Sequence, residues 1–274
     1  MGDKKGSIGI FDSGLGGLEV LKHIVKKLPQ YDFIYFGDNA RAPYGSRSQE
    51  VIFNFTLQAI LFLFKQNCPL IILACNTASA EALRKIQQEW LLKSFPNNRV
   101  LGVIIPAVQQ AVKISKNNKV GVIATEGTIK SKAFERELKK SNPKIKIFSN
   151  SASLLVPIVE AGEHNSQIAK IALQKYLKPI LAKKIDTLIL GCTHYGILEK
   201  QIKKTVGKNV RVISEGKVVA EKLVDYLQKH PEIEKQLSKN SQQLFLTTDL
   251  TNKFQKLGSN FFGKKIKPQK ITLE

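Results

Sequence analysis

Two of the three cysteines in the chain stand where a thiol could do acid/base chemistry. Cys75 lies in the segment 70–77 (LIILACNT), and Cys192 lies in the segment 188–194 (LILGCTH). A short run of Leu and Ile residues bounded by polar residues indicates a buried strand of a parallel sheet. Each cysteine is therefore expected at the carboxyl end of a strand, where open α/β folds bind their ligands.

The repeated pattern predicts that both thiols point at one shared cleft. A reaction that removes a proton from one face of a substrate atom and returns one to the other face needs two acid/base groups. We expect each thiol to precede a helix N-terminus, where the helix dipole lowers its pKa. The alternative is that Cys75 and Cys192 are small buried hydrophobic residues. Cys68 has only Asn67 and Pro69 beside it, and we expect it to be inert.

His194 follows the second cysteine by two positions and has three possible roles. It could be a buried core histidine, a metal ligand, or a group that moves protons beside Cys192. A zinc site needs four ligands at close spacing, and the sequence around Cys75, Cys192 and His194 offers no C-x-x-C pair or fourth ligand. A cysteine–histidine nucleophile would leave the second cysteine unexplained. The matched pair of thiols fits acid/base work better.

Two polar loops also follow predicted strands. The segment 12–17 (DSGLGG) lies between a strand and a helix, and its N–H groups could bind a carboxylate or phosphate. A purely structural turn explains these glycines equally well. The loop 38–45 (DNARAPYG) lies at the end of another predicted strand, where ligand contacts are common. Ligand binding and a plain turn remain equal alternatives there.

Composition describes an ordinary globular protein, with 43% hydrophobic and 24% charged residues. We expect no signal peptide and no membrane span. Three dispersed cysteines do not make a disulfide framework, which favours the cytoplasm. The net charge of +21 is mostly lysine spread along the chain, which favours a solvated surface. A polyanion partner, nucleic acid included, is the alternative function of a different class.

Strand-like and helix-like segments alternate throughout, which indicates an α/β fold with a mostly parallel, doubly wound sheet. One helix is expected over 78–92, followed by a turn at 96–98 where the pattern restarts. The segments 8–14 and 120–127 resemble each other, and so do the two cysteine segments. We therefore expect two pseudo-duplicated α/β domains with an active-site cleft between them. The first would contain residues 1–98 plus 211–274, and the second residues 99–210.

Several of these motifs together resemble the glutamate racemases of the cofactor-independent aspartate/glutamate racemase superfamily. The resemblance runs almost from end to end of the chain, and the two cysteine motifs are its most specific part. The matching segments are 9–17 (GIFDSGLGG), 35–38 (YFGD), 43–45 (PYG), 74–79 (ACNTAS), 124–128 (ATEGT), 155–160 (LVPIVE) and 191–195 (GCTHY).

The resemblance implies interconversion of L- and D-glutamate without pyridoxal phosphate or metal, which would supply D-glutamate for bacterial peptidoglycan. It also implies a homodimer. It implies that Cys75 abstracts the proton of the D-isomer and Cys192 that of the L-isomer. A related racemase acting on aspartate or a hydantoin is the nearest alternative. The assisting catalytic residues implied are Asp12, His194 and Glu160, and the implied substrate contacts are Asp12, Ser13, Tyr44, Gly45, Asn76, Thr77, Thr125, Thr193 and His194.

Overall fold

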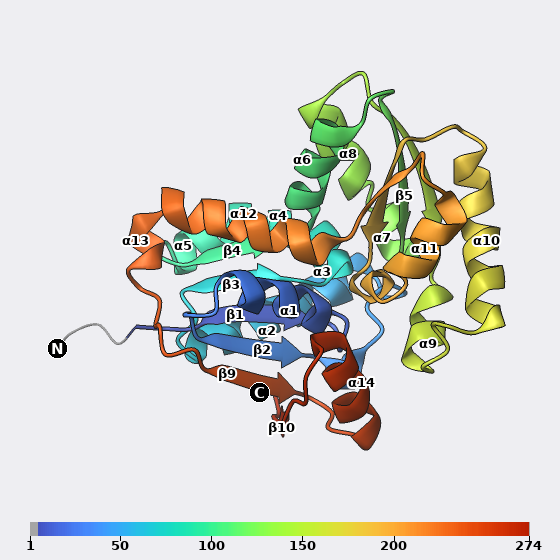
Figure 1. The fold of residues 1–274 in the computed structure, drawn as a ribbon. Helices are drawn as coiled ribbons and strands as arrows, with labels where there is room; N and C mark the ends of the chain where they lie inside the picture. The colour runs from blue at the N-terminus through green and yellow to red at the C-terminus, as the bar shows by residue number, and fades with distance from the viewer. Residues whose placement is uncertain (1–4, 274) are drawn as a thin grey trace.

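The computed structural model describes residues 5–273 and contains two parallel β-sheets flanked by helices (Figure 1). The larger sheet has the strand order β10-β9-β2-β1-β3-β4. Its strands are β1 (Ile8–Asp12), β2 (Phe33–Gly37), β3 (Leu70–Leu73), β4 (Arg99–Gly102), β9 (Gln243–Thr247) and β10 (Gln269–Lys270). All neighbouring strands in it pair in parallel.

The smaller sheet has the order β6-β5-β7-β8, again with parallel pairing. Its strands are β5 (Lys119–Ala124), β6 (Lys146–Ser151), β7 (Thr187–Gly191) and β8 (Arg211–Ile213). The expected fold class, two α/β units with mostly parallel sheets, is confirmed. Two strands belong to a different sheet from the one that the expected domain boundaries imply. Those boundaries would place β4 in the second domain and β8 in the first. β4 pairs with β3 in the larger sheet, and β8 pairs with β7 in the smaller one.

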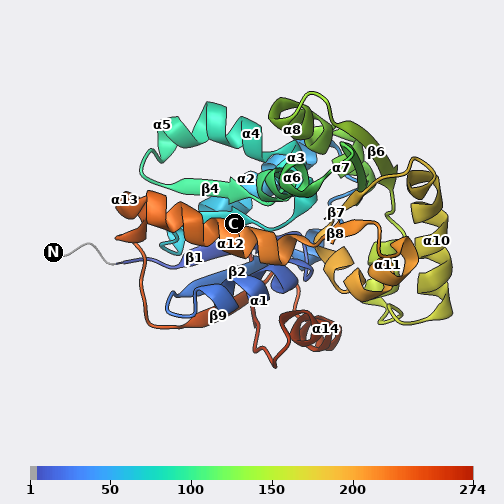
Figure 2. The same cartoon turned by 45° about the horizontal axis from the view of Figure 1, so that its top comes forward.

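Helices cover both faces of the larger sheet because alternate strand residues point to opposite sides. On β1, Ile8 and Ile10 face a core that includes α1 (Gly17–Lys27) and α12 (Glu215–Lys229). Phe11, next along the strand, faces a second core with α2 (Gln49–Lys65). α12 packs along α1 over its length, and Figure 2 shows it running from the smaller sheet across the larger one.

The smaller sheet is sandwiched in the same way. α6 (Ile104–Ile114) and α8 (Ala133–Ser141) cover one face, and α10 (Gln167–Leu181) and α11 (Glu199–Val206) cover the other. The core under α10 and α11 is continuous with the core under α1 and α12. The remaining helices are η1 (Asn39–Arg41), α3 (Asn76–Glu81), α7 (Glu126–Lys130), α9 (Leu155–Glu160), η3 (Thr193–Gly196), α13 (Pro231–Glu234) and α14 (Asn252–Phe262).

The single helix expected over 78–92 is wrong. The structure divides this stretch into α3, α4 (Leu83–Lys85), a π-helical segment η2 (Ile86–Leu91) and α5 (Leu92–Ser94). Tertiary contacts accompany the wide turn: Gln87 donates from Nε2 to the Val100 carbonyl at 2.7 Å, and Trp90 packs against Phe95. Within the described residues, no helix has the length and apolar character needed to cross a bilayer.

Candidate active site

Cys75 lies between the end of β3 and the first turn of α3. Its Sγ caps the helix by accepting a hydrogen bond from the Ala78 N–H at 3.5 Å. The thiol also donates to the Ser13 hydroxyl at 3.4 Å, and Ser13 lies in the loop that follows β1. The residue is only 5% exposed. The strand therefore delivers the thiol to the carboxyl edge of the larger sheet, as its apolar run predicts.

Cys192 occupies the equivalent place at the end of β7 in the smaller sheet. Its Sγ lies 3.9 Å from Nδ1 of His194. The other ring nitrogen, Nε2, is 3.0 Å from the carboxylate of Glu160 at the end of α9. The ring of Phe261, on α14, meets the imidazole edge-on at a centroid distance of 5.6 Å. The histidine is thus fixed on both sides, with one nitrogen toward the thiol and one toward a carboxylate.

Asp12 joins the two strand ends. Its carboxylate accepts a hydrogen bond from the Gly14 N–H at 3.0 Å within its own loop. It also accepts one from the Thr193 hydroxyl of the other half at 3.4 Å. The edge that carries Cys75 and the edge that carries Cys192 therefore meet at a fully buried carboxyl group.

The glycines of the 12–17 loop serve this close approach. A Cβ on Gly16 would lie 2.3 Å from the Thr193 hydroxyl and 2.7 Å from Nδ1 of His194. Both distances are far below contact distance, so a side chain at this position would push the two halves apart. Together with the Gly14 N–H, which binds Asp12, these distances give the glycines of the loop a structural role.

The helix-terminus effect expected to lower the thiol pKa values is outweighed. Burial, and after it the charge of Asp12, raise the pKa of Cys75 to about 11 against the opposing hydrogen bonds from Ser13 and Ala78. Burial raises the pKa of Cys192 well above its usual range, against a hydrogen bond from the His194 backbone. The helix expected directly after Cys192 is also a single 3₁₀ turn, η3, whose dipole is small.

The 38–45 loop is anchored at both ends. The Tyr44 hydroxyl donates to the buried Asp38 carboxylate at 2.5 Å, and Arg41 Nε donates to the same oxygen at 2.6 Å. The hydroxyl of Thr248, beyond β9, donates to the other oxygen at 2.9 Å. At its far end the loop reaches the smaller half, where the Gly45 carbonyl accepts a hydrogen bond from the N–H of Gly127 at 3.0 Å.

Three threonine hydroxyls lie at the same junction. Thr77 of α3 is 3.1 Å from Thr125, which caps α7, and 3.4 Å from Thr128. Thr125 and Thr128 are 3.0 Å apart. Thr77 and Thr125 were expected near the substrate, whereas Thr128 gave no signal of its own because its place depends on the first turn of α7.

Asn76 contacts a residue that sequence reasoning missed. Its Nδ2 donates to Glu215 at 2.7 Å, and Glu215 is the first residue of α12. The usable signal was that Glu215 follows closely on β8, at the same kind of strand end that drew attention to Asp12. Thr248, which holds the loop of Tyr44 by its hydrogen bond to Asp38, was also missed, although Asp38 itself belongs to the 38–45 loop that the sequence singled out.

The predicted site residues therefore converge where the carboxyl ends of the two sheets meet. Among residues 5–273, no group of three or more His, Cys, Asp or Glu side chains is placed to hold a metal ion. Cys68 precedes β3, whereas Cys75 follows it, and Cys68 is buried in the core that α2 covers.

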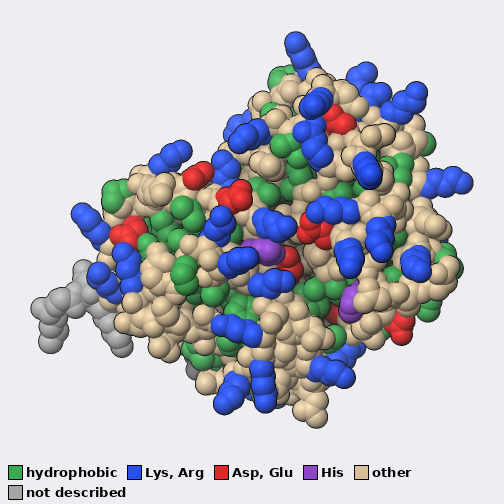
Figure 3. All heavy atoms as spheres, viewed as in Figure 1, with side chains coloured by type: hydrophobic (Ala, Val, Ile, Leu, Met, Phe, Trp, Pro, Cys, Tyr) green, Lys and Arg blue, Asp and Glu red, His purple; other side chains and the backbone are tan. Residues whose placement is uncertain are grey.

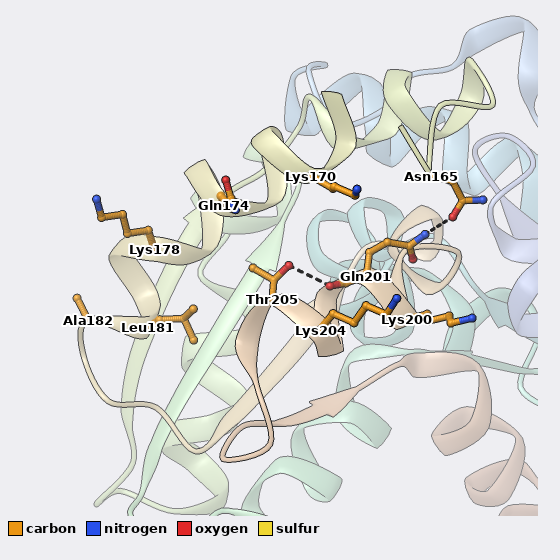
Figure 4. A pocket seen from close by; sticks show the side chains of 10 residues that line it. All are labelled: Asn165, Lys170, Gln174, Lys178, Leu181, Ala182, Lys200, Gln201, Lys204 and Thr205. Carbon is orange, nitrogen blue, oxygen red and sulfur yellow. Dashed lines mark hydrogen bonds between the residues drawn. The ribbon is translucent and has the colours of Figure 1, made fainter. Parts of the chain in front are cut away.

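A separate groove of about 950 Å³ runs between α10 and α11, and Figure 4 shows its side chains. None of the predicted site residues lines it. Four lysines do: Lys170, Lys178, Lys200 and Lys204.

Known proteins resemble this chain in sequence and in fold. The sequence model of the Asp/Glu/Hydantoin racemase family matches residues 8–223. A glutamate racemase of Geobacter metallireducens is 38% identical over 95% of this chain and 94% of its own, and one of Enterococcus faecalis is 40% identical over 97% and 96%. The crystal structure of a glutamate racemase isoform from Bacillus anthracis matches with a TM-score of 0.90 at 35% identity, covering 98% of each chain. That of Francisella tularensis glutamate racemase in complex with D-glutamate matches with 0.88 at 36% identity, covering 99% of each.

Proposed function

The chain belongs to the Asp/Glu/Hydantoin racemase family, and we propose that it interconverts L- and D-glutamate by acid/base chemistry at Cys75 and Cys192. The observation that carries this proposal is the placement of the two thiols. They end equivalent strands of the two sheets, on either side of the junction where Asp12 meets Thr193. The charge of a Cys75 thiolate is among those that raise the pKa of Cys192, so the two sulfurs lie within electrostatic range.

The reaction moves one proton in each direction. With L-glutamate, the Cys192 thiolate removes the α-proton, and the Cys75 thiol delivers a proton to the opposite face. With D-glutamate the roles reverse. Each turnover leaves the two thiols with their protonation states exchanged, so both groups must serve as acid and as base.

The resting thiols have to ionise before they can act. With a pKa of about 11, the Cys75 thiol is ionised in only about one molecule in ten thousand at pH 7. The ammonium group of bound glutamate is a cation in the same buried space. An opposite charge at close range lowers the pKa of a thiol, so substrate binding favours the thiolate that the reaction needs.

The two assisting groups differ between the halves. Asp12 lies beside Cys75, while His194 lies beside Cys192 and is oriented by Glu160. In the Glu160 carboxyl group, burial acts to raise the pKa, but the hydrogen bond and charge of His194 outweigh it and the pKa falls. An ionised Glu160 holds the imidazole with one nitrogen toward the thiol, which suits proton transfer there.

Binding of the carboxylates falls to hydroxyl and amide donors at the junction. Because the Tyr44 hydroxyl is already bound to Asp38, Tyr44 contributes through the loop backbone beside Gly45. Donors aimed at the α-carboxylate also stabilise the negative charge that develops when the α-proton leaves. The proposed contacts are Ser13, Tyr44, Gly45, Asn76, Thr77, Thr125 and Thr193, together with Asp12 and His194.

The cellular role and assembly follow from the family. D-glutamate made by this enzyme would supply peptidoglycan synthesis in the cytoplasm, and the protein would act as a homodimer. The two sheets would form the cores of two domains, with β4 in the first and β8 in the second. Sedimentation of the purified chain tests the dimer.

A racemisation assay tests the function. Purified protein incubated with L-glutamate, without added cofactor, should bring the optical rotation to zero, and D-glutamate should approach the same end point. L-aspartate under the same conditions is the control for substrate class. Turnover of aspartate in preference to glutamate would contradict the proposal.

A further inference from the structure

Glu215 is a carboxyl group buried beside the proposed site without a catalytic role assigned to it. It is the first residue of α12, and only 4% of it is exposed. Its Oε2 accepts a hydrogen bond from Nδ2 of Asn76 at 2.7 Å. Asn76 follows Cys75 directly in the chain. α12 follows β8 of the smaller sheet. Its first residue is thus hydrogen-bonded to the residue next to a catalytic thiol at the edge of the larger sheet.

This pair leaves two oxygen atoms without a donor. Oε1 of Glu215 and Oδ1 of Asn76 are both buried, and neither has a hydrogen-bond partner among the described residues. The oxygens of an ionised carboxylate can only accept hydrogen bonds, and the same is true of the amide oxygen. A buried acceptor without a hydrogen bond destabilises the folded state, and two such acceptors on one hydrogen-bonded pair destabilise it further. A proton on the pair would supply the missing donor.

We propose that Glu215 is protonated in the folded protein and that its neutral carboxyl group holds the Asn76 amide in the orientation that glutamate binding needs. The Oε1 hydroxyl then donates to Oδ1 of Asn76, while Oε2 accepts from Nδ2. A planar acid and a planar amide joined in this way fix one another, and both orphaned oxygens gain a partner. Glu215 is a positioning residue, and the inference rests on the proposed function because it acts through a substrate contact.

The surroundings oppose a negative charge at this position. Burial raises the pKa of Glu215 well above its usual range, and the charges of Glu19 on α1 and Asp12 on β1 raise it further, whereas the Asn76 hydrogen bond lowers it. His23 of α1 lies beside Gly216, the next residue of α12, and its Nε2 is hydrogen-bonded to Glu19 at 3.0 Å. A charge on Glu215 would also raise the pKa of Cys192.

A neutral Glu215 therefore suits the chemistry of the cleft. Glutamate brings two carboxylates, and proton abstraction adds further negative charge beside an ionised thiol. An ionised Glu215 would repel all of these. The protonated acid gives Asn76 a firm partner without adding to that repulsion.

The first test measures stability against pH in Glu215→Gln, which keeps an acceptor and a donor but cannot ionise. A carboxyl group whose folded pKa is raised gains a proton on folding at pH values between its unfolded pKa and its folded pKa. Wild type should therefore lose stability relative to Glu215→Gln as the pH rises. The ratio of their unfolding constants should change up to tenfold per pH unit between about pH 5.5 and about pH 7.5.

Glu221→Gln is the matched control, since Glu221 lies on the same helix and is exposed. Its ratio to wild type should stay flat over that pH range. A flat ratio for Glu215→Gln as well would overturn the proposal, because it would mean that Glu215 folds in the ionised form. This readout needs no racemase activity, so it stands apart from the proposed function.

The second test asks whether Glu215 acts through Asn76. Glu215→Ala should raise the KM for glutamate at least tenfold with a smaller change in kcat, since the lost orientation affects binding. Glu215→Gln should restore most of the KM lost in Glu215→Ala. Equal losses in both variants, with wild type active, would contradict the positioning role. A wild-type protein that does not racemise glutamate would instead contradict the proposed function.

Discussion

The two thiols rest in surroundings that oppose their ionisation. Burial raises both pKa values, and for Cys75 the neighbouring Asp12 adds to the effect. A poor resting base is consistent with a site that becomes active only when the ammonium group of the substrate lies beside the thiol. A weaker acid cannot replace the thiol, because the free energy needed to ionise the thiol itself is already large.

Replacing either thiol by serine should abolish racemisation. A serine hydroxyl is a far weaker acid than a thiol, so neither Cys75→Ser nor Cys192→Ser can complete the proton exchange. The substitution is nearly isosteric, and the fold should stay intact by circular dichroism and thermal unfolding. Cys68→Ser, in the core under α2, is the control and should keep its turnover if it folds. Either site variant retaining turnover within tenfold of wild type would exclude the two-thiol assignment.

The two assisting residues should matter unequally in the two directions. Asp12→Asn should act chiefly through Cys75, and His194→Asn chiefly through Cys192, which lies 3.9 Å from its imidazole. A positioned acid/base partner contributes roughly 10²–10⁴-fold to rate. L- and D-glutamate are equally stable, so kcat/KM must fall equally from both sides.

The asymmetry must therefore appear in kcat and KM taken separately, or in the isotope effect with α-deuterated substrate. Measurements from both enantiomers would show it. Identical kcat losses and identical isotope effects from both enantiomers, in both variants, would leave Asp12 and His194 as structural supports only.

At the scale of elements, the loop after β1 sets how closely the halves approach. Gly16→Ala should lower kcat/KM about a hundredfold, since a displacement of about 1 Å at a catalytic group costs that much. The added Cβ would lie 2.3 Å from the Thr193 hydroxyl. Gly14→Ala is the matched control in the same loop, because its Cβ would come no nearer than 3.8 Å to another residue. Equal kcat/KM in the two variants would show that the approach does not limit activity.

Short buried strands were the elements that sequence predicted best. The run Leu70–Leu73 is apolar throughout and buried throughout, so its end, and hence the place of Cys75, follows from composition alone. Sheet membership of β4 and β8 did not follow, because strand pairing is a long-range choice that local pattern does not encode. The broken helix over 76–94 has the same cause: Gln87 binds Val100, a partner outside its own helix.

The residues of the site also divide into those that a local motif predicts and those that long-range contacts determine. Residues at strand ends, such as Asp12 and His194, could be named in advance because each belongs to a local motif. The contacts of Glu215 and Thr248 could not, because each of these residues enters the site by way of a segment that returns from far along the chain. Their partners, Asn76 and Asp38, belong to the other end of the sequence.

At the scale of the whole molecule, the net positive charge comes mainly from lysines distributed along the chain. Figure 3 shows lysine and arginine side chains scattered over the visible face. Four lysines line the groove between α10 and α11, and Figure 4 shows Lys170, Lys200 and Lys204 extending along it while Lys178 points away. A net charge of +21 attracts polyanions through counterion release, whatever their sequence.

Binding of double-stranded DNA should therefore be non-specific and should leave racemisation unchanged. The logarithm of affinity should fall linearly with the logarithm of salt concentration, with a slope of about 0.9 per phosphate neutralised. Replacing the three exposed groove lysines, Lys170, Lys200 and Lys204, by glutamine removes three charges and should reduce the slope by at most about 3. The control replaces Lys26, Lys27 and Lys235, three exposed lysines elsewhere, and should reduce it equally. Because a dispersed charge makes no distinction between the two triple variants, loss of DNA binding in the groove variant alone would show that the groove is a dedicated polyanion site.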